Sequence, residues 1–296
     1  MDKKLIDFKQ KIAEYFPQMN ITSIKSGFDH GLHNDLILVN DELVVRFAKD
    51  DAAKKLLENE YRCIRLLKDK TNVPVPDMSC VDYGVVCYPY IHGQPLFRHR
   101  LFQLDAAEQQ SIMEQIADYM KQIHTIPLAE VRRAGIAVSL ASTDDPSEHY
   151  QNIMNGYERI KRELYPHMRP YTRSCVDAAY KGLENGSEWF DYTPCLIHGD
   201  LALEHFILDE DYKNITGILD FGVAGTGNPA HDMGVLLDGL GERFTSLMCP
   251  VYPDLDIVLS RARVGLCSAG WHLRGNDTGD IFWHLTHLMT AKDIHY

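Results

Sequence analysis

The sequence predicts an α+β fold in which a small antiparallel sheet comes first and a larger, mainly helical part follows. Residues 1–90 contain short apolar runs separated by turn residues, a pattern typical of antiparallel strands. From residue 105 onward, apolar residues recur at helical spacing, which predicts amphipathic helices. Two later apolar runs, over 195–197 and 218–219, each lead into an acid. They predict two buried strands with acids on adjacent loops.

The elements of the first part follow from apolar spacing and turn residues. They are a helix over 3–17, strands over 21–25, 36–39 and 43–47, a helix over 52–68, and a strand pair over 81–90. The run Val73-Pro74-Val75-Pro76 ends the second helix, because proline cannot continue it. The glycine-bearing loop over 26–31 could cover phosphate groups, although glycines in a hairpin are more often only a turn.

The second part is predicted to be helical for most of its length. Residues 105–126 carry apolar side chains at helical spacing, which predicts a core helix. His124 lies near its end and is expected to be a packed structural histidine rather than a ligand. Asp145 followed by Pro146 is a helix-start signal, and it predicts a charged helical stretch that continues to about residue 188.

Composition limits the classes of function. The 296-residue chain has a formal net charge of −12, which argues against a nucleic-acid partner. Such acidity usually serves solubility, but it also suits a cationic substrate. The first residues lack a continuous apolar run, and no segment is long enough to span a membrane, so we expect no signal peptide and no membrane partner. The seven cysteines are scattered, which predicts reduced thiols in the cytoplasm. We also expect a monomer.

Two short motifs carry the chemistry, and they are His198-Gly199-Asp200 and Asp220-Phe221-Gly222. A kinase fold holds a catalytic base beside a metal-binding acid in this way. Asp200 is therefore the candidate base, and Asp220 is the candidate Mg²⁺ ligand, since this ion prefers oxygen donors. His198 is expected to brace the first loop by hydrogen bonds rather than to take part in the chemistry.

The two motifs make the expected fold bilobal and protein-kinase-like. A nucleotide-binding N-lobe would span 1–90, and a catalytic and substrate-binding C-lobe would span 91–296. Arg46 alternates out of an apolar strand, and Glu60 lies on the next predicted helix; in kinases such a pair positions the nucleotide phosphates. The alternative is an exposed arginine and a solvated glutamate. A hinge between the lobes could hold the nucleotide base, and its candidate residues are Tyr88, Tyr90 and Ile91.

A third motif, Gly227-Asn228-Pro229-Ala230-His231-Asp232, follows the first two. Together the three motifs resemble the aminoglycoside phosphotransferase family, over residues 20–295. The resemblance implies a kinase-like fold, Asp200 as catalytic base, Asp220 as Mg²⁺ ligand, and ATP or GTP as phosphoryl donor. Asp232 falls at the position of the second conserved acid of this family. We count Asp232 among the candidate residues on the substrate side of the site, and we expect its role to be mainly structural.

Two positions depart from the family pattern. His205 stands where the family usually has an asparagine as metal ligand, and Arg46 stands where lysine is commoner. An imidazole is a poorer Mg²⁺ ligand than an amide oxygen, so His205 could bind directly, bind through a water, or leave a second metal weakly held. The Asp-x-x-x-x-His spacing resembles the branches that modify the 2''-hydroxyl of aminoglycosides and the 2'-hydroxyl of macrolides.

Residues downstream of the motifs are the candidates for binding the substrate. Asp238 and Glu242 would share one helix face if that segment is helical, because they are four residues apart. With Asp232 and Trp271, they could bind the ammonium groups of a cationic antibiotic. Solvated surface acids are nearly as plausible a reading of Asp238 and Glu242.

The expected function is an antibiotic kinase that uses Mg²⁺ and ATP or GTP to phosphorylate a hydroxyl group of an aminoglycoside. A protein kinase is disfavoured, because Asp220 and Asp232 are close in sequence and no Ala-Pro-Glu follows. Three alternatives stay open. They are a macrolide 2'-phosphotransferase, a kinase of another small hydroxylated metabolite or antibiotic, and a weakly catalytic kinase-like nucleotide-binding protein.

Overall fold

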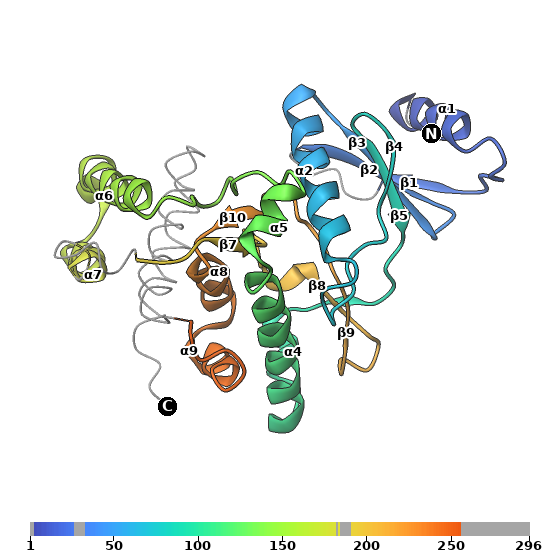
Figure 1. The fold of residues 1–296 in the computed structure, drawn as a ribbon. Coiled ribbons are helices and arrows are strands. Elements are labelled where there is room, and N and C mark those ends of the chain that lie inside the picture. The colour runs from blue at the N-terminus through green and yellow to red at the C-terminus, as the bar shows by residue number, and fades with distance from the viewer. Residues whose placement is uncertain (1–2, 27–32, 182, 184–190, 256–296) are drawn as a thin grey trace.

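The computed structural model describes residues 3–26, 33–181, 183 and 191–255 of the chain. The first part is a five-stranded antiparallel sheet with the strand order β1-β2-β3-β5-β4 (Figure 1). Its strands are β1 (Ile24–Ser26), β2 (Asn34–Val39), β3 (Leu43–Ala48), β4 (Ser79–Asp82) and β5 (Val85–Pro89). Two helices, α1 (Lys3–Tyr15) and α2 (Asp51–Leu67), accompany the sheet.

Strand alternation decides which side chain of β3 meets which helix, because successive side chains point to opposite faces of a sheet. Val45 is in one buried cluster with Phe8 of α1. Val44 is in a different cluster, together with Leu57 of α2. Arg46 is two residues after Val44, so its side chain lies on the α2 side of the sheet.

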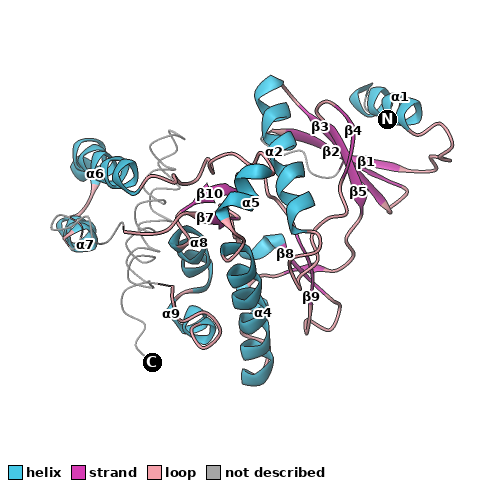
Figure 2. Cartoon of the chain, in the orientation of Figure 1, coloured by secondary structure: helices cyan, strands magenta, loops and turns pink. Residues whose placement is uncertain are grey.

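The second part is mainly helical and contains two small antiparallel sheets (Figure 2). The described helices are α3 (Arg98–Leu101), α4 (Ala106–His124), α5 (Leu128–Arg133), α6 (Pro146–Glu163), α7 (Pro170–Tyr180), α8 (Ala230–Leu240) and α9 (Glu242–Thr245). Short 3-10 helices are η1 (Tyr165–His167), η3 (Leu203–His205) and η4 (Ser246–Met248). One sheet contains β6 (Gln94–Pro95), β8 (Phe206–Leu208) and β9 (Ile215–Ile218), and the other pairs β7 (Cys195–Ile197) with β10 (Gly225–Gly227).

One apolar core joins the two parts. Leu57 of α2, Ile116 of α4, Phe206 of β8 and Met233 of α8 are all buried in the same cluster. Helix α4 begins in a capping box in which the Asp105 side chain accepts a hydrogen bond from the backbone of the third helical residue, an arrangement that fixes a helix start. Strands β7 and β9, which precede the two motif loops, also contribute to this core, so the loops start from one continuous apolar core.

Helices α6 and α7 form a separate unit, called here the α6–α7 hairpin. Its cluster of buried residues is distinct from the main core and includes Ile153, Tyr157 and Tyr180. The rings of Tyr157 and Tyr180 are stacked with their centroids 3.9 Å apart. Figure 1 shows the hairpin on the side of the molecule away from the five-stranded sheet.

The α+β, kinase-like fold class is confirmed, with some differences in detail. Strand β1 begins at Ile24 rather than at residue 21. The helical stretch predicted from residue 146 is two helices, and Pro170 stands at the start of the second, where a missing N–H costs nothing. The lobe boundary predicted at residue 90 stays a prediction. None of the helices in the described ranges has the length and apolar character needed to cross a membrane.

Candidate active site

Strands β7 and β9 bring the two motif loops to the same place. Their last residues, Ile197 and Ile218, are fully buried. Gly199 in the first loop has a φ of +84°, and an added Cβ would lie 2.8 Å from the carbonyl oxygen of Val223. Glycine is the residue that tolerates both this backbone conformation and this close approach. The first loop can therefore pack directly against the second.

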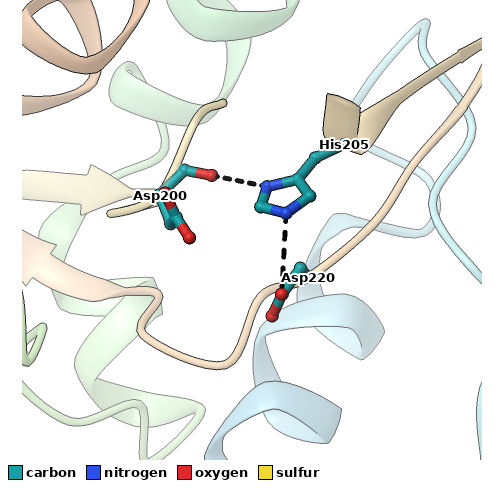
Figure 3. Close-up of side chains that lie close together, drawn as sticks. All are labelled: Asp200, His205 and Asp220. Atoms are coloured by element: carbon teal, nitrogen blue, oxygen red, sulfur yellow. Dashed lines mark hydrogen bonds and ion pairs between the residues drawn. The ribbon is translucent and has the colours of Figure 1, made fainter. Parts of the chain in front are cut away.

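Asp200, His205 and Asp220 meet at the ends of these strands (Figure 3). One potential ligand atom from each lies within 4.8 Å of the other two. His205 Nδ1 is 2.9 Å from the backbone oxygen of Asp200, and Nε2 is 3.6 Å from Oδ2 of Asp220. His205 thus bridges the two loops.

The hydrogen-bond partners of His205 determine which of its nitrogens is available. A carbonyl oxygen can only accept, so Nδ1 carries a hydrogen and donates it to Asp200. In the neutral ring the lone pair is then on Nε2, which faces the carboxylate of Asp220. The Asp220 side chain is 54% exposed, so the cluster is accessible. Two carboxylates and one nitrogen suit a divalent cation, and the oxygens would be the preferred ligands of Mg²⁺.

Asp200 sits in surroundings that raise the pKa of its carboxyl above the ordinary value. Burial raises the pKa of its carboxyl, the nearby carboxylates of Asp220 and Glu204 act in the same direction, and His205 opposes them. A carboxylate with a raised pKa is a stronger proton acceptor than one in water. The position of Asp200 therefore suits a group that accepts or orients a hydroxyl proton.

Asp220 has a left-handed backbone conformation, with a φ of +65°. This conformation costs a residue other than glycine about 1 kcal/mol or more, and it persists only where the surroundings hold it. The preceding residue supplies such support. The Leu219 N–H donates to the His205 carbonyl at 2.9 Å, and the Leu219 carbonyl lies 3.1 Å from Nε2 of His198.

His198 is placed to brace the two loops. Its Nε2 must carry a hydrogen, because its partner there is the carbonyl of Leu219. Burial lowers the pKa of the His198 ring to about 4, so the ring is neutral at physiological pH. A neutral buried ring that donates to the second loop can support the loop without adding a charge to the site.

Asp232, in the first turn of α8, is completely buried. It accepts from the backbone N–H groups of His198, at 2.9 Å, and Gly199, at 2.8 Å, and its Oδ2 lies 3.0 Å from Nε2 of His124. Burial acts to raise the pKa of Asp232, but the hydrogen bond from His124 and the nearby histidines outweigh it, so the pKa lies below its usual range. Without exposed surface Asp232 cannot touch a substrate, which corrects its placement on the substrate side of the site.

Arg46 and Glu60 form a buried ion pair. Arg46 Nη1 is 2.6 Å from Glu60 Oε1, and the two side chains are 12% and 2% exposed. The reading of these residues as an exposed arginine and a solvated glutamate is therefore wrong. Burial raises the pKa of Glu60, and the charge of Arg46 opposes that rise. The short contact between the two charged groups holds the guanidinium in one position on the α2 side of the sheet.

The predicted hinge residues have different environments. Tyr88 is buried beside Arg46, and burial raises its pKa to about 12. The Tyr90 N–H donates to the carbonyl of Glu42 at 2.6 Å, so this donor is already used within the protein. The side chain of Ile91 lies against β9, where a Cβ added to Gly217 would be 2.9 Å from its Cγ2. The assignment of all three to the nucleotide stays a prediction.

The candidate substrate residues are not arranged as predicted. Gly241 ends α8 with a φ of +77°, and Glu242 begins α9. Asp238 and Glu242 therefore lie on different helices and do not share a helix face. Trp271 lies outside the described residues.

Two polar residues near the motif loops were missed at the level of sequence. The Asn59 side chain bonds to the backbone of Ala137 and Ala224, and Ser139 Oγ donates to the Val223 carbonyl at 2.6 Å. A single asparagine on a helix and a single serine in a loop carry no spacing signal. Their role depends on segments that meet only in the folded chain.

Comparisons with known proteins agree with this geometry. Residues 26–252 match the sequence model described as the Phosphotransferase enzyme family, APH. The GDP and kanamycin complex of APH(2")-IIia has a TM-score of 0.82 and 25% identity, and the match covers 98% of this chain and 100% of that chain. Macrolide 2'-phosphotransferase type I shares the fold, with a TM-score of 0.70, 17% identity and coverage of 97% and 98%. The uncharacterized protein YcbJ of Bacillus subtilis (strain 168) is 21% identical over 244 residues, which are 75% of this chain and 76% of that protein.

The kinase-like fold, with two acids on adjacent loops, defines a phosphotransferase that uses an alcohol group as acceptor. The chain belongs to the Phosphotransferase enzyme family.

Proposed function

We propose that this protein is an antibiotic kinase that transfers the γ-phosphoryl group of ATP or GTP to a hydroxyl group of an aminoglycoside. The cluster of Asp200, His205 and Asp220 carries the proposal, because its donors lie within 4.8 Å of one another at the ends of two buried strands. The similarity to a structure described as a GDP and kanamycin complex supports a nucleotide donor and a cationic acceptor. The net charge of −12 suits such an acceptor.

The residues divide the work of phosphoryl transfer among them. Asp200 accepts or orients the proton of the attacking hydroxyl, a role that its raised pKa favours. Arg46, held by Glu60, offsets negative charge on the phosphates. Asp220, with His205 beside it, would hold Mg²⁺, and this ion would supply positive charge close to the transferred group. His198 and Asp232 keep the loop of Asp200 in place.

The first test replaces the proposed base. Asp200→Asn should lower kcat by about 10²–10⁴-fold, the range for loss of a general base, while circular dichroism and the affinity for nucleotide stay close to those of the native protein. Asp211→Asn is the matched control, because Asp211 is exposed in the turn between β8 and β9. Full activity of Asp200→Asn with any accepted substrate would remove Asp200 from this role.

The second test concerns the metal. Asp220→Ala should abolish Mg²⁺-dependent binding of nucleotide in calorimetry, because it removes the most accessible carboxylate of the cluster. His205→Ala should have a smaller effect, since an imidazole is a weaker ligand for this ion than a carboxylate. Retention of Mg²⁺-dependent binding by Asp220→Ala would contradict the proposed metal site.

The acceptor is tested with a panel of aminoglycosides, macrolides and simple sugars, each with ATP and with GTP. We expect phosphate transfer to at least one aminoglycoside. Transfer only to macrolides would favour the macrolide alternative, which the shared fold of macrolide 2'-phosphotransferase type I supports. Transfer only to sugars would indicate a metabolite kinase, and nucleotide binding without any transfer would indicate a kinase-like binding protein.

A further inference from the structure

A short parallel bridge lies beside the second motif loop and pairs Val138 with Thr226. The Thr226 N–H donates to the Ala137 carbonyl at 3.0 Å, and the Ser139 N–H donates to the Thr226 carbonyl at 2.9 Å. In a parallel ladder bonds alternate at even spacing, so the next one would run from the Ala137 N–H to the Ala224 carbonyl. A side chain occupies that place instead.

That side chain is Asn59 of α2. Its Oδ1 accepts from the Ala137 N–H at 2.8 Å, and its Nδ2 donates to the Ala224 carbonyl at 2.8 Å. A carboxamide offers one acceptor and two donors side by side, so it can complete the ladder between two strands. Its orientation is fixed by its partners, because the Ala137 N–H can only donate and the Ala224 carbonyl can only accept.

The two bonds connect elements that are distant in sequence. Asn59 is 78 residues from Ala137 and 165 residues from Ala224. Figure 1 shows α2 between the five-stranded sheet and α5, so the carboxamide joins the sheet-bearing part of the chain to the helical part. The next residue of α2 is Glu60, which holds Arg46.

The segment from Asp220 to Ala224 is anchored at both ends. At its start, Leu219 is bonded to His198 and His205. At its end, Ala224 is bonded to Asn59. Such support helps to hold Asp220 in its left-handed conformation, which costs any residue other than glycine some free energy.

We propose that Asn59 is a positioning residue that latches α2 to the end of the Asp220 loop. The latch fixes the Arg46–Glu60 pair relative to Asp220. The phosphate-binding cation, Arg46, and the metal-binding acid, Asp220, can then act on the same nucleotide. This inference rests on the proposed function for the roles of Arg46 and Asp220. Asn59 itself acts through the backbone of its two partners.

Two variants test the latch. Asn59→Leu keeps the approximate size of the side chain and removes both hydrogen bonds. Asn59→Asp keeps the acceptor for Ala137 but places a carboxylate against the carbonyl of Ala224. Each should raise the dissociation constant of Mg²⁺-nucleotide about tenfold, the effect expected when one or two hydrogen bonds of ordinary strength are lost.

Arg62→Met is the matched control. Arg62 lies nearly one turn further along α2 and also crosses to the helical part, where its Nη1 donates to the Gly135 carbonyl at 2.9 Å. It does not bond to the Asp220 loop in the described part of the chain. Its replacement should change the dissociation constant by less than about twofold, because the Arg62 side chain is 42% exposed and water can replace its contacts.

The second measurement is hydrogen exchange followed by mass spectrometry, without metal or nucleotide. In Asn59→Leu, peptides that cover 136–139 and 221–226 should exchange faster than in the native protein and in Arg62→Met. Unchanged exchange and unchanged nucleotide binding would overturn the proposal, and so would an equal effect of Arg62→Met. If Asn59→Leu fails to fold, the same measurements of nucleotide binding and hydrogen exchange on Asn59→Asp test the proposal. Loss of folding in both would assign Asn59 to stability and overturn a positioning role.

A failure of the positioning role of Asn59 can be distinguished from a failure of the proposed function. If Asp220→Ala keeps Mg²⁺-dependent binding, the proposed metal site fails, and the exchange measurement still tests the latch. If Asp220→Ala abolishes binding while Asn59→Leu leaves binding and exchange unchanged, only the latch fails.

Discussion

Asp232 beneath the loop of Asp200 and Asp177 in the α6–α7 hairpin make similar contacts in opposite surroundings. Asp232 is completely buried and accepts hydrogen bonds from two backbone N–H groups. Asp177 is exposed and accepts from the hydroxyl groups of Tyr157, at 2.6 Å, and Tyr165, at 2.5 Å. The pKa of each carboxyl lies below its ordinary range, for Asp177 chiefly because of these two hydrogen bonds.

The two carboxylates differ in whether water can replace a hydrogen bond that is lost. Water can solvate the exposed carboxylate of Asp177 if its hydrogen bonds break, so the net stabilisation is small. Water does not reach the N–H groups that face Asp232, so breaking these bonds leaves buried polar groups without partners. Burial therefore makes Asp232 a fixed support for the loop of Asp200, whereas Asp177 links two helices of a peripheral unit.

The largest effect is expected for Asp232→Ala. Removal of one partner from a buried charged network costs about 3–5 kcal/mol, so the free energy of unfolding should fall by that amount in urea titrations. Asp177→Ala is the matched control and should cost about 1 kcal/mol or less. Equal losses of unfolding free energy in the two variants would show that burial does not make Asp232 contribute more to stability than Asp177.

A second prediction tests whether the α6–α7 hairpin is independent of the proposed nucleotide site. Tyr180 is 1% exposed and stacks on Tyr157, so Tyr180→Ala should cost about 3 kcal/mol of local stability through the cavity it creates. Because the hairpin has its own core, proteolysis and hydrogen exchange should change in α6 and α7. Nucleotide affinity should stay within about twofold of native. A large loss of affinity would mean that the two cores are coupled.

The smallest effect is expected for the pH dependence of the stabilisation that Asp177 provides. Its folded-state pKa is lowered from the model-peptide value of 3.8, so its stabilisation is present above that value and is lost as pH falls through the folded-state pKa. Asp177→Asn removes this contribution. The difference in unfolding free energy between native protein and variant should therefore be about 1 kcal/mol or less at neutral pH and should shrink in acid. A difference that grows below pH 4 would contradict the assignment.

The sequence by itself determined the local chemistry. Apolar runs before Asp200 and Asp220 predict strands that end at these acids, and the structure has both strands. The alternation of Arg46 within an apolar strand predicts a cation on one face of a sheet, and the ion pair with Glu60 lies on that face. Such features can be predicted because strand and helix periodicities act over a few residues.

Other features were decided only by the tertiary structure. Burial removed Asp232 from the substrate side of the site. The bonds of Asn59 to Ala137 and Ala224 exist because α2 docks beside a bridge formed by two remote segments. Each depends on groups that are far apart in sequence. Local periodicity cannot specify such a pairing, because it arises only when packed elements bring the groups together.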